Sequence, residues 1–240
     1  MSEVFENEGR TTVRCIYLAI SCGVLVLAAC NSTPKTTGGL PTNLPLSPSQ
    51  YPGTLVYRSP TLPVAKGTYK AIMVETADIY RGADAEFGDA SEADKAKLAQ
   101  ELSAEFKNAL AKHNYPLTGQ AGQGVVRLHL ILAGLKESKP VAATALRLTP
   151  LGLGLSAAST AVGHSSALVG SVTVSGELID TQSGEALAGF VATESPIALD
   201  LTSGLGRFRA AELGIERGSE DFAGALDRAL NRNPADVRPQ

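Results

Sequence analysis

GVVRLHLILAG, residues 124–134, alternates between two kinds of side chain. The members that share one face of an extended chain are apolar: Val126, Leu128, Leu130 and Leu132. Arg127 and His129 fall on the opposite face, because successive side chains of a β-strand point to opposite sides. The stretch therefore predicts a strand with one face in a core and the other partly in contact with water.

Three further strands are predicted around this one. Residues 168–180 and 185–194 also alternate, and the four residues TQSG between them end in Gly184, which can adopt the positive φ of a tight turn. These two runs predict an antiparallel hairpin. Residues 69–76 (YKAIMVET) are apolar and β-branched enough to form an earlier strand.

Two amphipathic helices are predicted. The first follows a capping-box pattern that begins at Ser91, and it ends near Asn114 and Pro116. Its apolar residues recur every four positions: Leu98, Leu102, Phe106 and Leu110. The second is expected to begin with Ser219 as its N-cap and to stop at Asn233–Pro234. Its apolar positions are Phe222, Leu226 and Leu230.

The order of these elements predicts the fold. We expect an α/β (α+β) two-layer sandwich, in which a mixed sheet of about four strands carries two main helices on one face. The strands at 69–76 and 124–134 should be parallel and joined by a right-handed helical crossover. One domain over residues 67–233, followed by a tail at 234–240, accounts for the pattern.

Composition excludes some classes of function. The 240 residues carry a net charge of −3 without a basic block, so nucleic acid is not an expected partner. Tryptophan is absent and aromatic residues make up 5% of the chain, which leaves few side chains for stacking on bases. Because all three cysteines lie within residues 15–30, no disulfide is expected in the domain.

The apolar run at residues 15–30 is shorter than the roughly 20 residues of a membrane span, follows Arg14, and ends in small residues. It is typical of a signal peptide, which we place at residues 1–29. The acidic residues that precede it do not suit such a peptide: Glu3, Glu6 and Glu8. We therefore expect translation to start at Val13.

Leu27, Ala28, Ala29 and Cys30 resemble the lipobox of bacterial lipoproteins. The resemblance implies that Cys30 receives a diacylglyceryl group, becomes the first residue of the mature chain and is acylated at its amino terminus. Several acyl chains anchor a protein more firmly than one chain does. In many lipoproteins of this class, an aspartate directly after the lipidated cysteine retains the protein at the inner membrane. The corresponding residue here is Asn31, so the resemblance implies a position on the periplasmic side of the outer membrane. The alternatives are an ordinary secretory peptide and an apolar core segment with a chance cysteine.

Residues 30–66 are rich in proline, threonine, serine and glycine, which predicts an extended tether from the lipid to the domain. Within it, residues 50–52 and 55–57 are able to lie on the domain. An apolar insertion at 140–163 carries a single charge and is interrupted by proline and glycine, which argues against a membrane span. It either covers a sheet edge or forms a surface for membrane contact or self-association.

No candidate catalytic motif has the context that its chemistry needs. Residues 163–167 (GHSSA) resemble a serine-hydrolase nucleophile elbow, but a strand follows instead of preceding them, and His164 is the last histidine. The glycines of residues 118–124 precede a strand, whereas phosphate-binding loops follow one. Glu177 and Glu185 flank a hairpin. A glycosidase needs a pair of carboxyl groups of which one has a raised pKa, and no cleft that would raise it is expected near a hairpin tip.

Metal binding is not predicted either. The acidic residues of the 78–90 loop match no calcium-binding spacing. The histidines at 113, 129 and 164 are scattered along the chain, and the remaining cysteine is the lipidation site, so zinc lacks a ligand set. We therefore predict no catalytic, cofactor or metal-binding residue, and we expect the protein not to be an enzyme.

Four stretches are similar to an uncharacterised family of Gram-negative lipoproteins, a family of unknown function: residues 69–80, 124–134, 149–152 and 171–190. The similarity covers most of the mature chain and implies a fold and a location, without catalytic residues. We expect a non-enzymatic module that binds another envelope protein through the half-polar sheet face or the 140–163 insertion. The alternative is a protein that binds a lipid or small apolar ligand, with that insertion as a lid.

Overall fold

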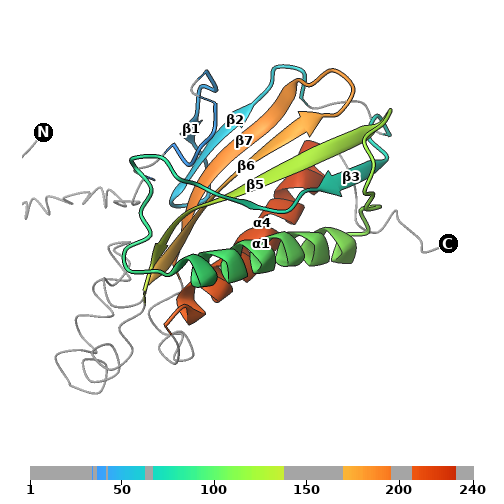
Figure 1. The fold of residues 1–240 in the computed structure, drawn as a ribbon. Helices are drawn as coiled ribbons and strands as arrows, with labels where there is room; N and C mark the ends of the chain where they lie inside the picture. Colours follow the sequence, from blue (N-terminus) through green and yellow to red (C-terminus); the bar gives the residue numbers. More distant parts are fainter. Residues whose placement is uncertain are drawn as a thin grey trace, which may run out of the picture.

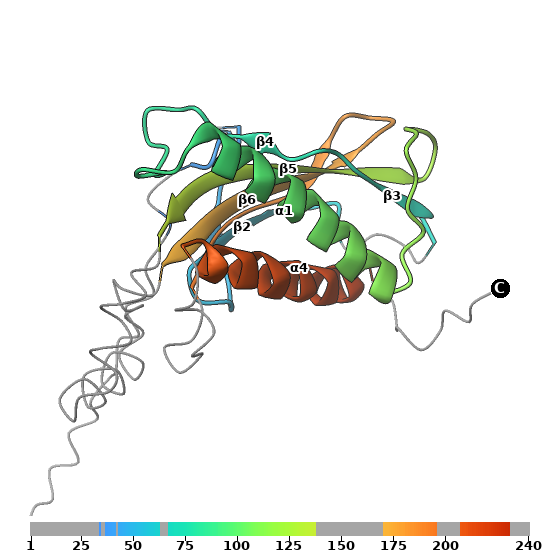
Figure 2. The ribbon, with the colours of Figure 1, turned by 60° about the horizontal axis from the view of Figure 1, so that its bottom comes forward.

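A computed structural model of the chain describes residues 34, 37–41, 43–62, 67–137, 170–195 and 207–230. The predicted signal peptide, Cys30, the 140–163 insertion and the 234–240 tail lie outside the described residues. The predicted class is confirmed: a mixed sheet carries two helices, and Figure 2 shows both helices on one face of the sheet. The elements are β1 (Ser47–Pro48), β2 (Thr54–Arg58), β3 (Ala71–Val74), β4 (Asp78–Ile79), α1 (Glu92–Lys112), β5 (Val125–Lys136), β6 (Ser171–Asp180), β7 (Ala186–Glu194) and α4 (Arg209–Ala229).

The sheet has seven strands in the order β1-β2-β7-β6-β5-β3, and β4 pairs with β5 beyond the end of β3 (Figure 1). Strand β5 is paired on both sides, by β6 and by β3 and β4, and its inner face is buried as the alternation predicts: Val126, Leu128, Leu130 and Leu132 are at most 1% exposed. Strands β3 and β5 are parallel. Strands β6 and β7 form the predicted antiparallel hairpin, and Gly184 has a φ of 74°.

The expected number of about four strands was too low, because residues 47–58 add β1 and β2 to the sheet and residues 78–79 add the short β4. Strand β2 pairs antiparallel with β7, with Leu55 opposite Val191, and β1 pairs with β2. The composition of this segment does not indicate a strand, because Leu55–Tyr57 is a short apolar run between prolines. An unpaired edge on β7 would leave its backbone groups without partners, and β2 supplies them.

The chain also crosses the other face of the sheet before it reaches β1. Ser175 of β6 donates a hydrogen bond to the carbonyl of Gly38, and Leu40 is 5% exposed. A Cβ on Gly38 would lie 2.7 Å from the Ser175 Cβ, and Gly38 has a φ of 62°, so the crossing requires glycine there. Much of the segment that we expected to act as a tether therefore packs on the domain.

Helix α1 begins and ends where the sequence predicts. Ser91 accepts a hydrogen bond from the backbone N–H of Asp94, and the Asp94 carboxylate accepts one from the Ser91 backbone, which completes the capping box. After the helix, Asn114 adopts a φ of 57°. The buried side of α1 packs on β3, β4 and β5.

The start of helix α4 was predicted wrongly. The helix begins at Arg209, ten residues before the expected N-cap, and Ser219 lies in its interior, where its hydroxyl donates to the Glu216 carbonyl at 2.8 Å. The missed turns bury small residues, such as Ala211 and Gly214, which carry little apolar signal. No helix in the described part of the chain is long and apolar enough to cross a membrane.

Candidate functional site

The helix layer is narrower than the sheet. Six strands side by side span about 24 Å at 4.8 Å spacing, whereas two helices packed 8–10 Å apart cover roughly 20 Å. Helix α1 packs over β3, β4 and β5, and α4 packs over β6 and β7. The inner face of β2 is therefore left without a helix above it.

A cavity of about 340 Å³ occupies this position, between α4 and strands β2, β6 and β7. Its lining is largely apolar and includes Val56 from β2, Val174 from β6 and Ile215 from α4. Ser49, Gln50 and Tyr51, from the turn between β1 and β2, also line it, together with the adjoining strand residues Pro48 and Thr54. The cavity is therefore made from three segments that are far apart in the sequence.

Three aromatic rings form one wall of the cavity. Phe106 of α1, Phe190 of β7 and Phe222 of α4 have ring centroids 5.3–6.4 Å apart. Gly176 on the neighbouring strand makes room for them, because a Cβ there would lie 2.5 Å from the Phe190 ring. Aromatic pairs at this separation stabilise each other beyond their buried area, so the wall is firmly held.

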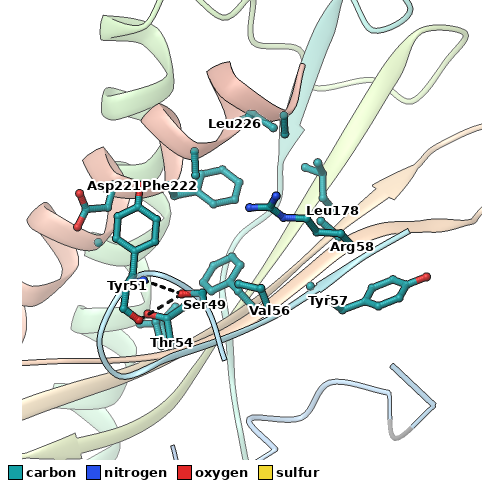
Figure 3. Close-up of a pocket in the computed structure, with 18 of the residues that line it drawn as sticks. Ser49, Tyr51, Thr54, Val56, Tyr57, Arg58, Leu178, Asp221, Phe222 and Leu226 are labelled. Atoms are coloured by element: carbon teal, nitrogen blue, oxygen red, sulfur yellow. Dashed lines mark hydrogen bonds between the residues drawn. The ribbon is translucent and has the colours of Figure 1, made fainter. Parts of the chain in front are cut away.

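The turn between β1 and β2 is attached to α4. The backbone N–H of Tyr51 donates to the Ser49 hydroxyl at 3.0 Å, which shapes the turn (Figure 3). Arg228 of α4 donates a hydrogen bond to the Tyr51 hydroxyl and lies 5.9 Å from the centre of its ring. This contact holds the turn against the helix, so the turn forms a side of the cavity.

One end of the cavity is acidic. Glu194 is partly buried, and burial raises the pKa of its carboxyl to about 7, with a smaller contribution from the negative charge of Asp221. The positive charge of Arg217 opposes the rise. Gly214 and Gly218 let α4 approach β7 here, since a Cβ on Gly214 would lie 3.1 Å from the Glu194 Cβ. The Glu194 carboxyl makes no hydrogen bond or ion pair with any residue that the structure describes.

The other end of the cavity is basic. Arg58, at the end of β2, is exposed to solvent and also lines the cavity. Figure 3 shows its guanidinium group extending toward Phe222. Within the described residues, the Arg58 guanidinium group has no hydrogen-bond or ion-pair partner. The cavity therefore reaches solvent beside an unpaired cation.

The family is shown by comparison with family models. A model described as "Protein of unknown function (DUF3313)" matches residues 45–222, well over half of the chain. The chain belongs to this DUF3313 family. No curated protein matches it.

Solved structures resemble the chain only distantly. A PelC dodecamer from Paraburkholderia phytofirmans is 11% identical, with a TM-score of 0.38, over 75% of this chain and 99% of that one. Protein XCC0632 from Xanthomonas campestris, of family DUF330, is 8% identical, with a TM-score of 0.35, over 68% of this chain and 87% of that one.

The half-polar sheet face of the DUF3313 chain carries its own ion pairs. His129 lies 2.9 Å from Asp78, and Arg127 lies 3.7 Å from Glu75. Burial raises the pKa of Glu177 on this face, and the positive charges of His129 and Arg127 oppose the rise. The crossing segment around Leu40 covers another part of the face, so the surface left for a partner is smaller than the sequence indicates.

The two glutamates that flank the hairpin do not come together. Glu177 lies on the outer face, whereas Glu185 accepts hydrogen bonds from Ser59 at 2.9 Å and from Thr61 at 3.4 Å. The loop carboxylates also have structural partners. Asp84, for example, accepts from the Tyr80 hydroxyl at 2.6 Å.

No group of three or more potential metal ligands occurs among the residues that the structure describes. The glycine-rich stretch at 118–124 forms a turn before β5, where Thr181 bonds the carbonyl of Gly122. His164 and the rest of the 163–167 motif lie outside the described residues.

One polar cluster was missed by sequence reasoning. Asp227 of α4 is 6% exposed, and its carboxylate lies 2.6 Å from the His113 Nδ1 and accepts a hydrogen bond from the Tyr115 hydroxyl at 2.8 Å. The partners are more than a hundred positions away in the sequence, so no local pattern indicates the contact. The cluster joins the end of α1 to α4 and lies outside the cavity.

Proposed function

We propose that this DUF3313 protein is a non-enzymatic envelope lipoprotein whose domain binds an apolar ligand in the cavity beneath α4. The lipobox-like sequence supports lipid attachment at Cys30 and a position on the periplasmic side of the outer membrane. The cavity itself is the observation that supports ligand binding. Its volume of about 340 Å³ lies within the range of small-molecule sites.

The chemistry of the lining supports binding over catalysis. Its polar groups are few and stand at the ends and along the turn that contains Ser49 and Tyr51. The lining includes neither histidine nor cysteine, so it offers no conventional nucleophile with a neighbouring base. An apolar site with a few placed polar groups suits a ligand that is held and released unchanged.

The ligand site proposed here lies in a different part of the chain from the one that the sequence suggested. That alternative used the 140–163 insertion as a lid, and the insertion lies outside the described residues. The cavity is lined instead by residues 48–62, strands β6 and β7, and helix α4, together with Phe106. The proposed ligand site therefore consists of described residues alone.

The test is whether the native protein carries a lipid that is not covalently attached. The full-length lipoprotein is purified from envelopes and extracted with organic solvent, which leaves the acyl groups on Cys30 attached. Mass spectrometry of the extract should find an apolar molecule in a near-stoichiometric amount. Ala225 lines the cavity, and Ala225→Leu should remove most of this ligand by filling the space.

The matched control is Ala111→Leu, which adds the same side chain to an exposed position of α1. It should leave the amount of ligand unchanged. The proposal fails if the wild-type extract contains no such molecule, or if Ala225→Leu and Ala111→Leu retain equal amounts. Circular dichroism of both variants verifies that they are folded.

A protein partner in the envelope is the second candidate function. The observation that favours it is the partly exposed mixture of charges on the outer sheet face, at Arg127, His129 and Glu177. A photocrosslinking residue at position 129, introduced into the lipoprotein in its native envelope, tests this. A single crosslinked protein, lost when Arg127→Glu is added, would support it, and the absence of any crosslink would reject it.

A further inference from the structure

The cavity has opposite charges at its two ends. Its lining contains three charged side chains, which are Arg58, Asp221 and Glu194. Arg58 pairs in register with Ala188, six residues before Glu194 on β7. At about 3.3 Å per residue, the two ends are roughly 20 Å apart along the strand.

We propose that the ligand is a single-chain anionic amphiphile whose carboxylate or phosphate head group binds Arg58. Its apolar chain lies along Phe190 and Phe222, and its far end points toward Glu194. This inference rests on the proposed function and adds the chemical class of the ligand and its direction in the cavity.

The free guanidinium group of Arg58 supports placing the anionic head group at this end of the cavity. A guanidinium group forms paired hydrogen bonds with carboxylate and phosphate, and it keeps its charge at any physiological pH. The Arg58 guanidinium group has no partner among the described residues, whereas that of Arg228 is engaged with Tyr51. A head group at Arg58 also stays in contact with water, because this residue is exposed.

The opposite end is unsuited to an anion. Asp221 would repel a carboxylate or phosphate there, and Glu194 would do so in its charged form. The raised pKa of Glu194 means that this carboxyl tends toward its neutral form near pH 7, so an apolar chain end can approach it at lower cost. Arg217 already faces Glu194 with a positive charge, which reduces the attraction that this end would have for an amine.

The experiment measures binding of four probes with the same twelve-carbon chain to the full chain carrying Cys30→Ala. The probes are dodecanoate, dodecyl phosphate, dodecanol and dodecylamine, titrated below their micellar concentrations in an isothermal calorimeter at pH 6.5. We expect at least one anionic probe to bind about tenfold or more tightly than the alcohol. The comparison of carboxylate with phosphate distinguishes fatty acids from phosphorylated lipids.

Arg58→Gln should weaken binding of the anionic probe by about tenfold and leave dodecanol unchanged. The control is Arg81→Gln, which removes the same charge at an exposed position outside the cavity and should leave all affinities unchanged. Equal binding of anion and alcohol, tighter binding of dodecylamine, or equal effects of the two arginine substitutions would overturn the inference.

Failure of this inference can be told apart from failure of the proposed function. If Ala225→Leu abolishes binding of all probes and Arg58→Gln changes none, the cavity binds apolar ligands and only the anionic head group is wrong. If no probe binds, or if Ala225→Leu leaves all affinities unchanged, the proposed function and this inference both fail.

Discussion

Replacing Glu194 with glutamine should change how the stability of the domain depends on pH. The ordinary pKa of this carboxyl is 4.5, and burial raises it to about 7 in the folded chain. Folding therefore favours the protonated form, and unfolding releases a proton between these two values. The free energy of unfolding should be highest below pH 4.5, fall as the pH rises to 7, and change little from this cause above that.

The size of the effect follows from the two values. A difference of 7 − 4.5 at 1.36 kcal/mol per pH unit is about 3 kcal/mol, which partial exposure of the side chain lowers to about 2 kcal/mol. Glu194→Gln cannot ionise and removes this penalty. Above pH 7 the variant should be more stable than the parent by about this amount, with the advantage gone near pH 4.

Urea unfolding followed by far-ultraviolet circular dichroism at pH 4, 5.5, 7 and 8.5 measures this difference. The full chain carrying Cys30→Ala serves as the parent. The other carboxyls contribute equally to the pH dependence of parent and variant, so their contributions cancel in the difference. Asp94 is one of them, and its hydrogen bond with Ser91 lowers its pKa. Asp221 and Arg217, the charged groups that face Glu194, are present in both the parent and the variant.

Glu216→Gln, at an exposed position of the same helix, is the control and should show a difference that does not vary with pH. The reasoning is refuted if the advantage of Glu194→Gln is constant from pH 4 to 8.5, or if it grows as the solution becomes more acidic. A constant advantage would mean that the Glu194 carboxyl is solvated in the folded chain, and a growing one would mean that its charged form is stabilised there.

Three further predictions concern other parts of the chain. Asp227→Ala should lower the unfolding free energy by about 2–4 kcal/mol in urea titrations, because two hydrogen bonds are lost, while Asp227→Asn should cost less. Leu40→Ala should cost about 2–4 kcal/mol by the same assay, and a loss near zero would show that the crossing segment is a free tether. Cys30→Ala should move the protein from the detergent phase to the aqueous phase in Triton X-114 partitioning, and retention in the detergent phase would contradict lipid attachment there.

Local patterns predicted the elements whose signals are strong and continuous. Helix α1 has a side-chain cap at Ser91 and large apolar residues at regular spacing, so its limits could be derived from neighbouring residues alone. Strand β5 alternates between partly exposed and buried residues from Val125 to Leu130. The start of α4 could not be derived in this way, because Phe208 at its N-cap makes no side-chain capping bond and the first turns bury small residues.

The cavity could not be predicted from local patterns. Arg58, Glu194 and Phe222 come from three segments, and nothing near any one of them in the sequence indicates the others. The segment that carries Arg58 was expected to be a tether, since its proline and threonine content outweighs the short apolar run in β2. Strand β2 provides hydrogen-bond partners for the backbone groups of β7 that would otherwise be unpaired. These partners lie more than a hundred residues away in the sequence, so no local pattern indicates the pairing.

The sequence alone determined the α+β class, the half-buried strand β5, helix α1 and the hairpin. Each of these depends on residues within about twenty positions of one another, where capping, side-chain periodicity and turn geometry act directly. Tertiary structure decided the rest: the strands from residues 47–58, the full length of α4 and the apolar cavity with Arg58 and Glu194 at its ends. The cavity arises because a six-strand width of sheet exceeds what two helices cover, and that width exists only once residues 47–58 have paired with the distant strand β7.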